Sequence, residues 1–143
     1  MANSMYSKIL AANDGSAGGL RALAAAIDLA RQASAEVHMV TVEELPRFPA
    51  SIDEVAEEKD EANHRFAPVI AAAEAQASAA GVTIDTHLVP GHVVDAVIGL
   101  IKHLKADLLV VGFMGHSQLY ERIIASTTDR LVRLAPCSVL VVK

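Results

Sequence analysis

An apolar run that stops at a glycine constrains this chain more than any other feature of its sequence. Leu108 to Val111 contains no polar residue, which predicts a strand buried on both faces of a sheet. Gly112 and Gly115 follow, with Phe113 and Met114 between them. Glycines adopt backbone angles that side chains forbid and let a ligand approach the main chain. The pattern therefore predicts a buried parallel strand that ends in a turn with room for a ligand.

Hydroxyl side chains follow this turn, just before the last helical pattern of the chain. Ser126, Thr127 and Thr128 precede apolar residues at helical spacing, beginning with Leu131. Serine and threonine are favoured at the N-cap of a helix. A glycine turn that faces the N–H groups of a helix start can hold a phosphate without any lysine. In the simpler alternative, Ser126 and Thr127 only cap the helix.

Five apolar runs alternate with four helical segments. The other expected strands are Tyr6–Ala12, Val37–Val42, Val82–Val89 and Ser138–Val142, and the other expected helices are those around Leu20–Ala30, Ile52–Ala80 and Val93–Leu104. Pro68 is expected to interrupt the second helix, and Pro90 and Gly91 to close the third strand. The alternation predicts a three-layer α/β fold, Rossmann-like, with an open parallel five-stranded sheet in the order 3-2-1-4-5 and helices on both faces.

The first helical segment shows which of its faces should be buried. Leu20, Leu23 and Ile27 recur at helical spacing and are expected to face the sheet. Asp28 and Arg31 fall on the opposite side and are expected to face solvent.

The carboxyl ends of the first and fourth strands are expected to share one rim of the sheet. Asp14 follows the first strand, and Gly112 ends the fourth. In the order 3-2-1-4-5 the winding reverses between these two strands, and open α/β sheets bind ligands at such a reversal. Asp14 and Gly112 are therefore expected to flank a ligand. Asp14 could instead only cap the first helix, where a carboxylate favours the positive end of the helix dipole.

Composition narrows the partners and the location. The chain of 143 residues is expected to form one domain, 1–143. Its net charge is −5 and only 3% of its residues are aromatic, which argues against a nucleic-acid partner.

No run reaches the roughly 18 apolar residues of a membrane span, so we expect a soluble cytoplasmic protein. Cys137 is the only cysteine. Because the histidines are scattered singly along the sequence, we expect no histidine metal site.

These residues resemble the universal stress protein family along nearly the whole chain. The nucleotide-binding members carry a glycine, two residues, a glycine, nine residues, a glycine and then serine or threonine. Here Gly112 and Gly115 are followed, after nine residues, by Ala125 and Ser126, so alanine stands in place of the third glycine. The segments 13–16 and 135–142 and the pair Gly115-His116 also resemble the family.

The resemblance implies an adenine nucleotide, ATP, ADP or AMP, bound together with Mg²⁺ or Mn²⁺. Asp14 would contact the ribose or the adenine region, and Val42 would offer its backbone to the adenine edge. The methyl group of Ala125 either crowds the phosphate path or points away from it. The residues that the resemblance places near the phosphates are Gly112, Gly115, Ser126 and Thr127. His116 either approaches a phosphate or points into solvent.

The function expected from this resemblance is a regulatory nucleotide-binding module in the stress response. A slow ATP hydrolase is one alternative, although beyond Asp14 the sequence offers only His116 or Arg122 to orient water or stabilise charge. A nucleotide-free dimeric scaffold is another, and Ala125 favours it. A phosphoacceptor receiver domain is set aside because the third strand ends in Leu88-Val89-Pro90, without an acceptor aspartate.

The last strand is expected to mediate assembly. In the order 3-2-1-4-5, Ser138–Val142 lies at an edge of the sheet and is strongly apolar. An exposed apolar edge favours pairing with another chain. We therefore expect a homodimer formed through Ser138 to Val142, as the resemblance also implies.

Overall fold

The computed structural model describes residues 4–44, 52–113 and 127–143, with the backbone alone for 52–63. The elements in chain order are β1 (Lys8–Ala12), α1 (Ala17–Ala33), β2 (Glu36–Glu44), α2 (Ile52–Ala79), β3 (Ile84–Gly91), α3 (Val93–Leu104), β4 (Leu108–Gly112) and β5 (Ser138–Val142). A further helix covers residues 127–134. Within these described ranges, none of the helices is both long and apolar enough to cross a membrane.

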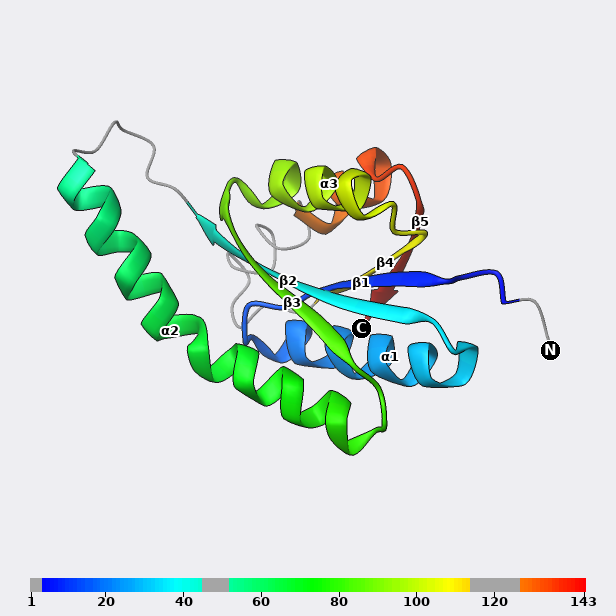
Figure 1. Cartoon of the computed structure of the whole chain (residues 1–143). Helices are drawn as coiled ribbons and strands as arrows, with labels where there is room; N and C mark the ends of the chain where they lie inside the picture. The colour runs from blue at the N-terminus through cyan, green and yellow to red at the C-terminus, as the bar shows by residue number, and fades with distance from the viewer. Residues whose placement is uncertain (1–3, 45–51, 114–126) are drawn as a thin grey trace.

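The five strands form one parallel sheet in the order β3-β2-β1-β4-β5. Helices α1 and α2 cover one face of this sheet, while α3 and the helix 127–134 cover the other (Figure 1). Strand β1 lies at the centre and pairs with β2 and with β4. The predicted three-layer Rossmann-like architecture and its strand order are therefore confirmed.

Each central strand supplies side chains to two separate hydrophobic cores, because successive residues of a strand point to opposite faces. On β1, Ile9 and Ala11 belong to the core beneath α1, whereas Leu10 belongs to the core beneath α3. Strand β4 divides in the same way, with Leu108 and Val110 in the first core. The second core holds Leu109 and Val111 from that strand, together with Leu10, Val40, Val94, Val97, Ile101, Ala106 and Leu131.

Helix α1 follows the predicted face except at its first turn. Leu23 and Ile27 are buried as expected. Asp28 and Arg31 are exposed and form an ion pair of 2.9 Å. The expectation for Leu20 is wrong, since 46% of this residue is exposed. The buried stripe is made largely of small residues, Gly18, Gly19, Ala22, Ala26 and Ala30, which hold the helix backbone close to the sheet and leave Leu20 beyond the edge of the stripe.

Both expectations drawn from prolines need correction. Helix α2 continues through Pro68 as one helix. Buried Phe66 before this proline, and Ala73 and Ala77 after it, pack both halves of the helix and offset the lost hydrogen bond. Strand β3 includes Pro90 and Gly91, in register with Glu43 and Glu44 of β2. Proline is tolerated there because β3 is an outer strand and pairs on one side only.

Candidate functional site

A pocket of about 720 Å³ opens at the carboxyl ends of β1, β2 and β4. This volume lies within the range of small-molecule sites, roughly 300–1,000 Å³. Its apolar walls come from β2, β4, α3 and the helix 127–134, with Val40, Val42, Val93, Val97, Val111 and Leu131. Its polar residues are Asn13, Asp14, Ser16, Glu44, Arg65, Thr127 and Thr128. The pocket thus combines an apolar interior with polar groups that can orient a ligand.

The turn from β1 to α1 holds Asp14 in place through hydrogen bonds between side chains and backbone. The side-chain oxygen of Asn13 accepts from the N–H of Gly15 at 2.9 Å, and an oxygen of Asp14 accepts from the N–H of Ser16 at 2.9 Å. Asn13 itself is buried, and its carbonyl accepts from the Thr41 hydroxyl at 2.8 Å. The exposed Asp14 carboxylate therefore lies at the pocket on a well-anchored turn.

The N-terminus of α1 also lies at this pocket. Ser16 is the N-cap, and its hydroxyl accepts from the N–H of Gly19 at 3.2 Å. The first turn carries no acidic residue, and Gly18 and Gly19 line the pocket. A side-chain carbon added to Gly19 would lie 2.5 Å from the Asn13 oxygen. Helix α1 can approach the turn this closely only because Gly19 has no side chain. The positive end of the helix dipole then faces the pocket, where it can attract an anion.

Gly112 is required by packing between two backbones. A side-chain carbon at this position would lie 2.3 Å from the carbonyl oxygen of Gly18 on α1. The sequence interpretation, in which this glycine admits a ligand, therefore misses a separate reason for its presence. On the other side, the hydroxyl of buried Thr128 donates to the carbonyl of Gly112 at 3.2 Å. Gly112 thus links the start of α1 and the start of helix 127–134 at one point of the rim.

The backbone of Val42 is directed over this rim. The N–H of Asn13 donates to the carbonyl of Val40 at 3.0 Å, so the polar backbone groups of Val40 face β1. Because these groups alternate from residue to residue along a strand, those of Val42 face the same side. Strand β1 has already ended at Ala12, and Val42 lines the pocket. Its N–H and C=O therefore point into space that a ligand can occupy.

Helix α2 adds two residues that the sequence analysis missed. Arg65 and Phe66 line the pocket, and the guanidinium of Arg65 lies 4.4 Å from the centre of the Phe66 ring. Phe66 is buried. No motif joins these residues to the rim, because only the packing of α2 against the sheet brings them there. A stacked guanidinium beside an apolar wall can contact both an aromatic base and an anion.

Four of the residues singled out from the sequence meet at the pocket: Asp14, Val42, Gly112 and Thr127. Gly115, His116, Ala125 and Ser126 lie outside the described residues.

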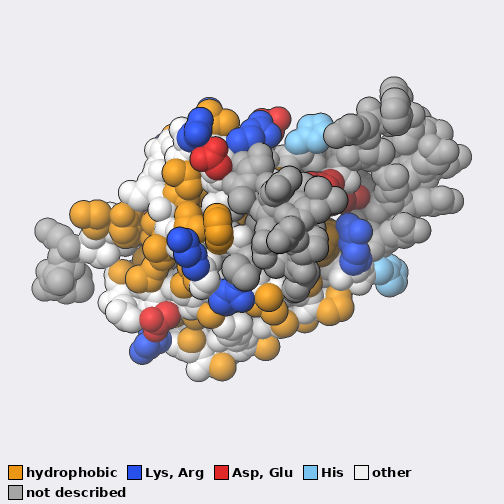
Figure 2. Space-filling view, turned by 180° about the vertical axis from the view of Figure 1, so that it is seen from behind, with side chains coloured by type: hydrophobic (Ala, Val, Ile, Leu, Met, Phe, Trp, Pro, Cys, Tyr) orange, Lys and Arg blue, Asp and Glu red, His pale blue; other side chains and the backbone are white. Residues whose placement is uncertain are grey.

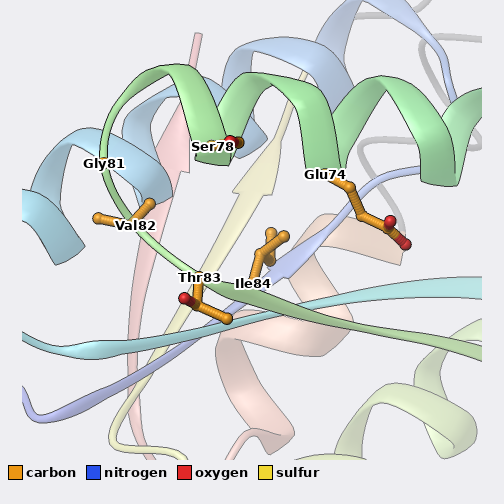
Figure 3. Close-up of a pocket in the computed structure, with 6 residues that line it drawn as sticks. All are labelled: Glu74, Ser78, Gly81, Val82, Thr83 and Ile84. Atoms are coloured by element: carbon orange, nitrogen blue, oxygen red, sulfur yellow. The ribbon is translucent and has the colours of Figure 1, made fainter.

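A second hollow lies near the other end of the sheet, between the end of α2 and the start of β3 (Figure 3). Its volume is about 460 Å³, and it is lined by Glu74, Ser78, Gly81, Val82, Thr83 and Ile84. One carboxylate and two hydroxyls on a broad surface offer little to hold or activate a ligand. The pocket at the carboxyl ends of the strands is therefore the stronger candidate, as expected for an open α/β sheet.

Two histidines that are far apart in the sequence meet on neighbouring strands. Nδ1 of His38 on β2 lies 3.0 Å from Nε2 of His87 on β3, and the two rings stack with centroids 5.2 Å apart. The register explains this contact, because His38 pairs with Asp85 and Val40 with His87. Histidines that are scattered singly along the sequence are therefore brought together by the sheet in this pair.

Comparison with known proteins then settles the family. A family model described as the universal stress protein family matches residues 5–143. The chain belongs to the universal stress protein family. The match includes every strand of the sheet, so the resemblance inferred from the glycine pattern and the two flanking segments is confirmed.

Relatives of this universal stress protein are similar over its whole length. Universal stress protein MJ0531 of Methanocaldococcus jannaschii is 32% identical over 147 residues, which cover 97% of this chain and 83% of the relative. A universal stress protein crystallised in complex with cAMP is 31% identical, with a TM-score of 0.77 and coverage of 98% and 99%. The universal stress protein from Archaeoglobus fulgidus in complex with dAMP shares the fold at 21% identity, with a TM-score of 0.67 and coverage of 98% and 100%.

Proposed function

We propose that this universal stress protein binds an adenine nucleotide in the pocket at the carboxyl ends of β1, β2 and β4. The observation that carries the proposal is the pocket itself, which joins apolar walls, a strand backbone directed over the rim and the N-terminus of α1. The relative with 31% identity that was crystallised with cAMP adds support, because it is similar over 98% of this chain.

The base and the sugar are assigned to the part of the pocket next to β2. The valines of the interior, among them Val40 and Val97, supply apolar contact for the faces of the adenine ring. The N–H and C=O of Val42 pair with its polar edge. The Asp14 carboxylate accepts hydrogen bonds from the ribose hydroxyls, which are strong because the acceptor is charged.

The phosphates are assigned to the N-terminal ends of α1 and of helix 127–134. Gly112 and Thr127 lie at this side of the pocket. Gly115, His116 and Ser126 are proposed as phosphate contacts from the sequence pattern alone. Among the described lining residues, two carboxylates, Asp14 and Glu44, accompany the single basic residue Arg65. A polyphosphate therefore needs added positive charge, and we propose that ATP binds with Mg²⁺ or Mn²⁺ whereas AMP binds without it.

The Asp14→Asn variant is expected to lower adenine-nucleotide affinity by about tenfold, because it removes the charge that strengthens the hydrogen bonds to ribose. The asparagine oxygen can still accept from the Ser16 N–H, so the turn should persist. Isothermal titration with AMP, cAMP and ATP, each with and without Mg²⁺, measures the change. Asp95→Asn is the matched control, because Asp95 is exposed on the first turn of α3 and does not line the pocket.

Nucleotide affinity that is equal in wild type and Asp14→Asn would refute the assignment of Asp14. Absence of binding of all three nucleotides to the wild type would favour the nucleotide-free scaffold instead. Phosphate release from ATP above the background rate would identify a slow hydrolase. We propose the binding module, acting as a single domain, 1–143, in the stress response of the cytoplasm.

We further propose that the protein forms a homodimer through β5. This strand lies at the edge of the sheet, and 38% of Leu140 is exposed on it. Val132 and Leu134 of the preceding helix are exposed as well. Figure 2 shows the side of the molecule that Figure 1 hides, with apolar side chains spread over it. Pairing of two β5 strands would complete the hydrogen bonding of the edge and cover part of this apolar surface.

Substitution of Leu140 by lysine is expected to convert the dimer to a monomer, because it places two ammonium groups in an apolar contact near the symmetry axis. Sedimentation velocity at several protein concentrations measures the mass. Met5→Lys serves as the control, since Met5 is exposed and lies before β1, away from the proposed contact. A wild type that remains monomeric at micromolar concentration would contradict the proposed dimer.

A further inference from the structure

Four metal-ligating side chains lie on one face of β2 and β3, separate from the nucleotide pocket. Glu36 and His38 are two residues apart on β2, and Asp85 and His87 are two residues apart on β3. Residues two apart on a strand point to the same face, and His38 is in register with Asp85. Strand β3 lies beside β2 at the outer edge of the sheet (Figure 1). None of the four residues lines the pocket at the rim.

His38 is the centre of this group. Its side chain is only 5% exposed, and both of its ring nitrogens have close partners. Nε2 lies 2.7 Å from an oxygen of Glu36, and Nδ1 lies 3.0 Å from Nε2 of His87 and 3.8 Å from an oxygen of Asp85. One ligand atom each from Glu36, His38 and Asp85 can be chosen so that all three lie within 4.8 Å of one another. A buried imidazole between two carboxylates is thus already assembled.

We propose that Glu36, His38 and Asp85 form a binding site for a divalent transition-metal ion, with Zn²⁺ as the best match, and that His87 orients the His38 ring. Imidazole nitrogen combined with carboxylate oxygen suits zinc, whereas magnesium and calcium prefer oxygen ligands alone. A tetrahedral zinc site with bonds near 2.0 Å separates its ligand atoms by about 3.3 Å. The side chains of Glu36 and Asp85 are 51% and 62% exposed, so Glu36 can rotate to that spacing and Asp85, now 3.8 Å from Nδ1 of His38, can turn toward Nε2.

Proton placement at His38 supports this arrangement. A neutral imidazole has one N–H and one lone pair, so His38 can donate through Nδ1 to His87 while Nε2 binds the metal beside Glu36. Such a hydrogen bond from the second ring nitrogen fixes the orientation of most metal-binding histidines. Nε2 of His87, when it carries no proton, accepts this hydrogen bond.

The Lys8 ammonium lies beside one carboxylate oxygen of Glu36 and leaves the other oxygen for the metal. Nζ of Lys8 lies 3.8 Å from Oε2 of Glu36 and donates to the Leu104 carbonyl at 2.9 Å. It is Oε1 of Glu36 that contacts His38. Lys8 can therefore hold the carboxylate from one side while the other oxygen coordinates. The ion would join the outer strand β3 to β2, which carries Val42 to the rim.

The test is titration of tag-free, chelator-treated protein with ZnCl₂ by isothermal titration calorimetry. We expect one equivalent of Zn²⁺ to bind with micromolar affinity. The Asp85→Asn and Glu36→Gln variants should each weaken binding by at least about tenfold, and His87→Ala by about 10–100-fold, as for other residues that orient a ligand. The matched controls are Asp95→Asn and His92→Gln, which change a carboxylate and an imidazole at exposed positions of α3 and its N-cap.

A second measurement keeps the test independent of folding in the variants. In wild-type protein, NMR of the imidazole groups should show the His38 and His87 signals shifting together at one equivalent of Zn²⁺, ahead of those of His92 and His103. Wild-type stability against heat should also rise with Zn²⁺, because the ion binds the folded state. Unchanged affinity in both Asp85→Asn and Glu36→Gln, or shifts confined to other histidines, would overturn the site.

Discussion

The Gly112→Ala variant is expected to be less stable than the wild type. Its free energy of unfolding should be lower by about 1–3 kcal/mol or more, the usual cost of excess volume in a packed interior. The added methyl carbon would lie 2.3 Å from the Gly18 carbonyl oxygen, with the Gly18 carbonyl carbon at 2.4 Å. These are backbone atoms at the start of α1, so no side-chain rotation can relieve the clash. Either α1 or the end of β4 must move, and both line the pocket at the carboxyl ends of the strands.

Gly99→Ala is the control that separates the clash from the loss of a glycine. Gly99 lies within α3, and a side-chain carbon there would meet no atom within 4 Å. Alanine at this site should therefore stabilise the protein by about 0.5–1 kcal/mol through helix propensity. Urea unfolding followed by circular dichroism gives both values, since the chain has no tryptophan. Equal stability of Gly112→Ala and wild type would refute the proposed backbone contact.

The second large effect is expected for Leu109→Ala, which should lower the free energy of unfolding by about 2–5 kcal/mol. Leu109 is fully buried on β4, in register with Leu10 of β1 on one side and Val139 of β5 on the other. Its removal leaves a cavity in the core beneath α3, which neighbouring strands cannot close without breaking their pairing. For a chain of this length the melting temperature should fall by roughly 5–15 °C.

Leu20→Ala provides the matched comparison for this loss. It removes the same number of atoms, but Leu20 lies on α1 with 46% of its surface exposed. It should cost far less than Leu109→Ala, because fewer of its atoms leave water on folding. Calorimetry of both variants at one protein concentration measures the difference. A melting temperature of Leu109→Ala within a degree or so of wild type would contradict the assignment of Leu109 to a rigid core.

Local pattern was enough to predict the architecture. The run Leu108–Val111 indicated a strand buried on both faces, and its residues do divide between two cores. The end of α2 is set just as locally, since Gly81, two residues after Ala79, has φ of +77° and its N–H donates to the Ser78 carbonyl. Such features depend on neighbours within a few residues, and hydrophobic periodicity reports them directly.

Errors arose where tertiary position overrode a local rule. Proline cannot donate a backbone hydrogen bond, so Pro90 was expected to close the third strand. An outer strand needs hydrogen bonds on one side only, so β3 continues through Pro90. Leu20 has the spacing of a core residue, yet small residues on α1 define the stripe that packs. Gly18 and Gly112 look unrelated in the sequence, and the contact between their backbones exists only once β4 lies beneath α1.

Only the part of the candidate site that lies directly after strands could be predicted from the sequence. Asp14 and Gly112 follow strands, and the rule for parallel sheets places such residues at one rim, where the pocket lies. Arg65 and Phe66 come from the middle of a long helix, whose docking angle no short motif encodes. The meeting of His38 with His87 likewise depends on the register of β2 with β3, which the spacing of histidines along the chain does not reveal.

The alternation along β1 has a consequence for how this fold can change over time. Ile9 and Ala11 serve one core while Leu10, between them, serves the other. Inserting or deleting a single residue ahead of Ile9, without restoring the register of β1 with its neighbours, would move every side chain of this strand from one core to the other. Changes in chain length are therefore confined to the connections, where they leave the parity of the central strand intact, whereas substitutions within β1 can alter one layer and spare the other.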